Sequence, residues 1–64
     1  MTVNEAKKMF GIKESDELWA DNIERMIEST QKYLGTWSIA KEDRAKAEKE
    51  MEALMVLYKE AINN

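Results

Sequence analysis

Apolar residues recur at helical spacing in three stretches of the chain, and the two glycines, Gly11 and Gly35, fall between these stretches. Apolar positions three or four residues apart indicate one face of an amphipathic helix. Proline, which would interrupt a helix, is absent. The pattern predicts an all-α fold with a single domain over residues 1–64. We expect a small three-helix domain, in which an antiparallel hairpin of the second and third helices is crossed by a short first helix.

The first helix is predicted over residues 3–10. Thr2 and Glu5 have the spacing of a capping box, in which each side chain accepts a hydrogen bond from the other residue's backbone N–H. Gly11 follows the last predicted helical residue and tolerates the positive φ that often ends a helix. Ile12 is then placed to fold back as the hydrophobic contact of that ending.

The second helix is predicted to begin after Ser15 or Asp16, since either side chain can cap it. It is predicted to end at Gly35, which we expect to repeat the conformation of Gly11. The residues of its core-facing stripe, at successive helical spacings, are Trp19, Ile23, Met26, Ile27, Thr30, Tyr33 and Leu34.

The third helix is predicted from Ile39 or Lys41 to Ile62, with Ser38 as its cap. The residues of its core stripe are Ala47, Met51, Leu54, Met55, Tyr58 and Ile62. Together the three patterns predict a hydrophobic core of Phe10, Trp19, Ile23, Met26, Ile27, Leu34, Met51, Leu54, Tyr58 and Ile62.

This layout resembles the J domain of DnaJ-type co-chaperones, over nearly the whole chain. The matching landmarks are the Phe10, Gly11 and Ile12 junction, Lys32 and Tyr33 at the end of the second helix, and Ala47, Glu48 and Tyr58 in the third. The resemblance implies a J-domain-like packing of the helices and a chaperone partner. A degenerate J-like co-chaperone module is therefore one alternative for the function.

Two features that carry the activity of J domains differ here. At the positions of the family's His-Pro-Asp motif this chain has Leu34, Gly35 and Thr36. The second helix of J domains is generally basic, whereas residues 14–28 hold six acidic residues and only Arg25 as a basic one. We therefore do not carry over the stimulation of a chaperone ATPase.

Composition argues against an enzyme. The chain has no cysteine and no histidine, so disulfides, thiolate chemistry, the commonest general base and the commonest metal ligand are all missing. Glu24 and Glu28, like Glu48 and Glu52, are spaced one helical turn apart, and we interpret both pairs as solvated surface. We expect no catalytic residue, cofactor or metal.

Charge and hydropathy limit the partners. A net charge of −3 provides no basic excess for a phosphate backbone, so nucleic acid is not the expected partner. The basic residues of the third helix keep a helix-turn-helix DNA-binding protein as an alternative. No apolar run approaches the roughly 20 residues of a membrane-spanning helix, and residues 1–10 lack the apolar core of a signal peptide. Without cysteines to cross-link so small a domain, we expect a reducing, cytoplasmic location and no membrane contact.

Three residues are candidates for a protein-binding surface: Trp37, Val56 and Leu57. Trp37 lies in the connection after Gly35, where it either closes the open end of the hairpin or anchors a partner. Leu57 flanks the predicted core stripe and Val56 points away from it, so the two would meet a partner or a second copy of the chain. The sequence thus predicts a small protein-interaction module, a regulator or inhibitor of a larger host or bacteriophage machine, and leaves a homo-oligomer open.

Overall fold

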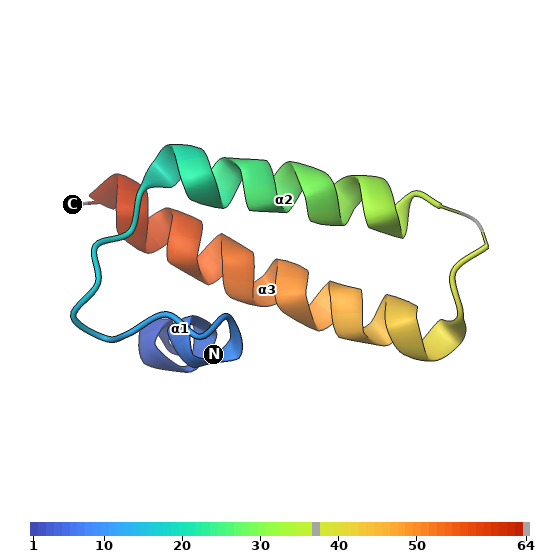
Figure 1. Cartoon of the computed structure of the whole chain (residues 1–64), viewed down its shortest axis with the longest axis horizontal. Coiled ribbons are helices and arrows are strands. Elements are labelled where there is room, and N and C mark those ends of the chain that lie inside the picture. Colours follow the sequence, from blue (N-terminus) through green and yellow to red (C-terminus); the bar gives the residue numbers. More distant parts are fainter. Residues whose placement is uncertain (37, 64) are drawn as a thin grey trace.

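The computed structural model describes residues 1–36 and 38–63, which form three helices (Figure 1). These are α1 (Val3–Met9), α2 (Ala20–Leu34) and α3 (Lys41–Asn63). α2 and α3 run antiparallel, and α1 lies against α3 on the side away from α2 (Figure 1). The predicted all-α class, with a helical hairpin and a short N-terminal helix, is confirmed. Within the described residues, no helix combines the length and the apolar run needed to cross a bilayer.

The start of α1 is closed by the predicted capping box. The Thr2 N–H donates to Glu5 Oε1 at 3.1 Å, and the Glu5 N–H donates to Thr2 Oγ1 at 3.2 Å. The hydrogen bond from the Thr2 backbone lowers the pKa of the Glu5 carboxyl below its ordinary value, because it stabilises the charged form. A four-residue motif is thus enough to start this helix.

The end of α1 is a Schellman motif. Gly11 has a φ of +69°, and its N–H donates to the Lys8 carbonyl at 3.2 Å, while the Ile12 N–H donates to the Lys7 carbonyl at 2.9 Å. Ile12 packs against the hydrophobic core. The predicted roles of Gly11 and Ile12 are therefore confirmed.

α2 begins later than predicted. Its first helical residue is Ala20, and neither Ser15 nor Asp16 caps it. In a helix capped at Asp16, the Asp16 carbonyl would accept the N–H of residue 20, but here it accepts a hydrogen bond from Lys7 Nζ at 3.1 Å. The N-cap position is taken by Trp19, in an extended conformation with φ −102° and ψ 116°. Helical periodicity consequently does not determine where the Trp19 side chain points.

The connection between α2 and α3 differs from the prediction at two residues. Gly35 caps α2 with a right-handed φ of −76°, so it does not repeat the conformation of Gly11. The Thr36 hydroxyl donates to the Lys32 carbonyl at 3.2 Å and satisfies one of the last carbonyls of α2. α3 begins at Lys41, one of the two predicted starts, and Ser38 lies too far before it to be its cap.

The hydrophobic core lies where α3 meets the other two helices. Its buried cluster consists of Ala6, Ile23, Ala53, Leu54 and Leu57. The partly buried apolar residues packed against it are Val3, Phe10, Ile12, Leu18, Met26, Ile27, Val56 and Tyr58. The prediction is confirmed for Ile23 and Leu54, which are buried, and Phe10, Met26, Ile27 and Tyr58 pack at the edge of the core. Leu34 and Met51 are half-buried.

The predicted core was wrong at Trp19 and Ile62, which are 63% and 56% exposed, and Met55 of the predicted stripe is exposed as well. α3 contacts both α1 and α2, whereas α1 and α2 do not approach each other within the described residues. A helix with neighbours on two sides buries a wider arc than one stripe, and on α3 this arc includes Leu57 and Ala53. Ile62 and Met55 lie outside it.

Candidate interaction surface

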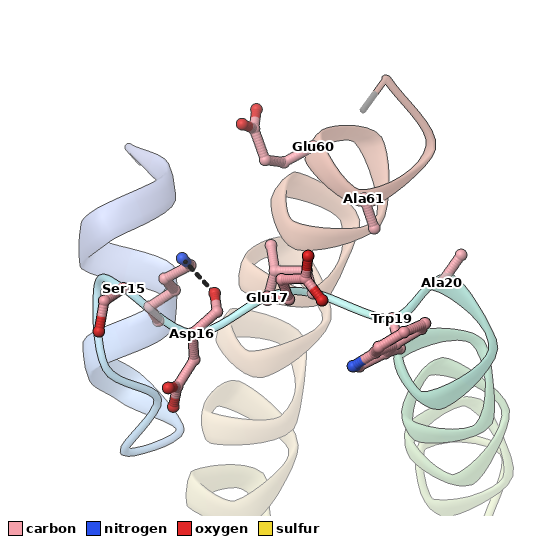
Figure 2. A pocket seen from close by; sticks show the side chains of 9 residues that line it. Ser15, Asp16, Glu17, Trp19, Ala20, Glu60 and Ala61 are labelled. Atoms are coloured by element: carbon pink, nitrogen blue, oxygen red, sulfur yellow. Dashed lines mark hydrogen bonds between the residues drawn. The ribbon is translucent and has the colours of Figure 1, made fainter.

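Residues 16–19, in the loop before α2, line two neighbouring depressions of the surface. The first, of about 520 Å³, lies between this loop and the last turns of α3, at Glu60 and Ala61 (Figure 2). The second, of about 430 Å³, extends along the first turns of α2 to Met26. We call Asp16, Glu17, Trp19 and Glu60, with these two depressions, the Trp19 surface.

Trp19 is the most exposed large apolar side chain in the described part of the chain. Successive side chains of an extended segment point to opposite sides, so Leu18 and Trp19 diverge. Leu18 packs against the core, and Trp19 faces outward. Figure 2 shows the indole beside the first turn of α2. The residue thus borders both depressions without being buried in either.

Lys7 of α1 holds the loop that carries Trp19. Its side chain is only 7% exposed, and its Nζ donates to the carbonyls of Glu14 at 2.9 Å and Asp16 at 3.1 Å. Figure 2 shows the bond to Asp16 as a dashed line. The Asp16 N–H in turn donates to the Lys13 carbonyl at 3.0 Å, closing a turn. The loop is therefore ordered by the protein itself, which lowers the entropy cost of docking a partner.

The Trp19 surface is negatively charged. Asp16, Glu17 and Glu60 provide three carboxylates among the residues that line the depressions. The single cation among those residues is Lys7, whose ammonium group already binds two backbone carbonyls. Asp16 and Glu17 are exposed, and Glu60 is half-buried. Figure 2 shows the Asp16 and Glu17 side chains on the loop and that of Glu60 on α3.

The structure places two of the three predicted binding residues, Val56 and Leu57, against the core. Leu57 is completely buried between α3 and its neighbours, so the prediction that it contacts a partner of the folded monomer is wrong. Val56 is half-buried and packs against the core cluster. Trp37 lies outside the described residues.

Sequence reasoning missed the exposure of Trp19 and the burial of Lys7, although each leaves a signal. Three and four residues before Trp19 stand the polar Asp16 and Ser15, so the apolar stripe of α2 does not continue toward the N-terminus. Lys7 stands four residues after Val3, on the apolar side of α1. A lysine at such a position can bury its aliphatic stem and direct its ammonium group to backbone carbonyls.

The acidic residues elsewhere conform to the interpretation as solvated surface. Glu24, Glu28, Glu48 and Glu52 are all exposed. Among residues 1–36 and 38–63, no three acidic side chains gather in a way that would hold a metal ion.

Comparisons with models of known protein families, with curated proteins and with solved structures find no match for this chain. The resemblance to J domains consequently stays a prediction from the landmark residues.

Proposed function

We propose that this protein is a small interaction module that docks a partner protein at the Trp19 surface. The observation that carries this proposal is the exposure of Trp19, at 63%, between two depressions. Tryptophan is enriched among the few residues that dominate the energetics of protein interfaces. In this proposal a partner covers the exposed indole and places side chains in the two depressions beside it.

The size of the domain is compatible with such a role. Its accessible surface is 5006 Å², and a standard interface covers about 800 Å² of each partner, or roughly a sixth of that surface. The Trp19 surface lies at the end of the molecule where the loop before α2 meets the last turns of α3 (Figure 1). A partner that covers this end and the neighbouring flanks of α2 and α3 reaches the standard size.

A module of this kind acts by covering a surface of its partner. We therefore propose that it regulates or inhibits a larger protein machine, by blocking a surface that the machine uses for another contact. The loop bound by Lys7 suits this task, because a preformed surface loses little freedom on binding.

The test is an affinity pull-down from a lysate of the native host, with the protein immobilised through its N-terminus to keep the end of α3 free. Trp19→Ser is the test variant, and Tyr33→Ser is the matched control. Tyr33 is also an exposed aromatic residue of α2, at 46% exposure, but it lines neither depression. Circular dichroism verifies that both variants keep their helices.

We expect one dominant protein that Trp19→Ser loses and Tyr33→Ser retains, with the loss reproduced using the purified partner. Equal recovery by both variants would contradict the proposal. Recovery of a DnaK-type chaperone that binds independently of Trp19 would instead favour the J-like alternative. Binding of duplex DNA with a steep salt dependence would favour the helix-turn-helix alternative.

A further inference from the structure

We infer that the segment docked at the Trp19 surface carries arginine or lysine side chains. This inference rests on the proposed function and specifies the chemistry of the partner. Its basis is the combination of an exposed indole with three carboxylates around one pair of depressions.

The indole is a suitable receptor for a cation. Tryptophan has the aromatic face that attracts an ammonium or guanidinium group most strongly, through the quadrupole of the ring. Arginine adds planar stacking to this attraction, because its guanidinium is flat and weakly hydrated. Trp19 offers most of its ring to a ligand, since its side chain is 63% exposed.

The surrounding charges select for the same occupant. A cation on Trp19 lies near Asp16 and Glu17 of the loop, and Glu60 borders the first depression from α3. An acidic segment would be repelled by these groups, because the single ammonium of Lys7 offsets only one of the three carboxylates.

The second depression accommodates the apolar part of such a side chain. It is lined by the half-buried Ile12 and Met26 beside Trp19. Arginine and lysine commonly lay their methylene stems along apolar surface while the charged group reaches a polar partner. One long basic side chain can therefore pack its stem beside Met26 and place its charge near Glu17.

The probe is a blocked heptapeptide of alternating arginine and glycine, titrated into the protein and followed by NMR. The comparison peptides replace arginine by glutamate or by leucine. We expect the arginine peptide to shift the Trp19 indole N–H and the backbone amides of residues 16–20, with the glutamate peptide inactive. Raising the salt concentration from about 0.01 to about 1 M shortens the Debye length from about 30 to about 3 Å, so it should weaken binding markedly.

The variants separate the charge from the indole. Glu17→Gln combined with Glu60→Gln should weaken binding roughly two- to 25-fold, since each exposed ion pair contributes roughly 1.4- to fivefold. Glu28→Gln combined with Glu52→Gln removes the same charge from exposed helix positions outside both depressions and should change affinity less than about twofold. Trp19→Phe should retain part of the affinity that Trp19→Ser loses.

Two results would overturn the inference. One is a leucine peptide that binds as tightly as the arginine peptide, with no effect of Glu17→Gln and Glu60→Gln. The other is self-association through Trp19, seen as a mass in light scattering that grows with concentration and returns to the monomer in Trp19→Ser. The proposed function survives the first result if Trp19→Ser still loses the partner in the pull-down, and it fails separately if that loss is absent.

Discussion

Replacing each of the two glycines by alanine should change the stability of the fold in opposite directions. Gly11 has a φ of +69°, and a Cβ added there meets no atom within 4 Å, so an alanine is opposed by the backbone conformation alone. Gly35 has a right-handed φ of −76°. A Cβ added at Gly35 lies 3.5 Å from the carbonyl oxygens of Gln31 and Lys32, which is ordinary van der Waals contact.

The magnitudes follow from these two conformations. A left-handed backbone costs an L-residue about 1–2 kcal/mol, and replacing glycine by alanine recovers about 0.4–1 kcal/mol by restricting the unfolded chain. Gly11→Ala should therefore destabilise the fold by about 1 kcal/mol. Gly35→Ala restricts the unfolded chain in the same way without requiring a left-handed backbone, so it should stabilise the fold by about 0.4–1 kcal/mol. At about 4–8 °C per kcal/mol for a domain of this size, the two midpoints should differ by roughly 6–16 °C.

Thermal and urea unfolding, followed by far-ultraviolet circular dichroism, measure both effects. Gly11→Asn is the control, because asparagine tolerates the left-handed region, and it should cost clearly less than Gly11→Ala. If Gly11→Ala were as stable as the wild type, or if both alanine variants shifted stability in the same direction, the assignment of the two helix ends would be refuted.

Three further changes test the hydrogen bonds from Lys7 to the loop, the core and the capping box. Lys7→Met keeps the apolar stem but removes the donor to the loop before α2. The NMR order parameters of the loop amides should therefore fall from about 0.85 toward 0.6. Unchanged values would mean that other contacts hold the loop. Leu57→Ala should lower the free energy of unfolding, measured in urea, by about 2–5 kcal/mol because the Leu57 side chain is fully buried. Met55→Ala, at an exposed position, should change it by less than about 0.5 kcal/mol. Equal effects would contradict the burial pattern of α3. Because the pKa of Glu5 is lowered in the folded state, the stability that it contributes is present above its ordinary pKa of 4.5 and is lost as the pH falls through the lower, folded value. Thr2→Ala keeps the backbone N–H and removes only the side-chain hydrogen bond, so it should return the NMR-measured pKa of Glu5 partway toward 4.5; no change would exclude the Thr2 side chain as a contributor.

Local signals in the sequence were sufficient to predict how both ends of α1 are capped. The Thr2 and Glu5 spacing and the Gly11 and Ile12 pair each act within a few residues, so their structures follow from neighbours in the chain. The same reasoning failed at Gly35, because a glycine after a helix permits a left-handed ending without requiring it.

The errors that matter for the candidate site have a tertiary cause. Trp19 has helical spacing to Ile23, but α2 begins only at Ala20, after a loop whose Asp16 carbonyl binds Lys7, so the periodic pattern does not apply to Trp19. Leu57 was assigned to the surface because the prediction gave α3 a single core stripe. Contact with α1 turns that position inward, and no spacing within α3 encodes it.

The position of α3 between the other helices has a consequence for local opening. α2 and α3 are joined by a short connection, whereas α1 meets α3 through residues as distant in the chain as Ala6 and Ala53, a contact that closes a long loop. A fluctuation that detaches α1 leaves the hairpin paired, since the backbones of α1 and α2 do not approach each other in the described part of the chain. Such an opening also withdraws Lys7 from the loop, so the arrangement around Trp19 exists only while α1 is docked. Any molecule that binds there selects the closed form, and it should slow hydrogen exchange in α1, a helix that it does not cover.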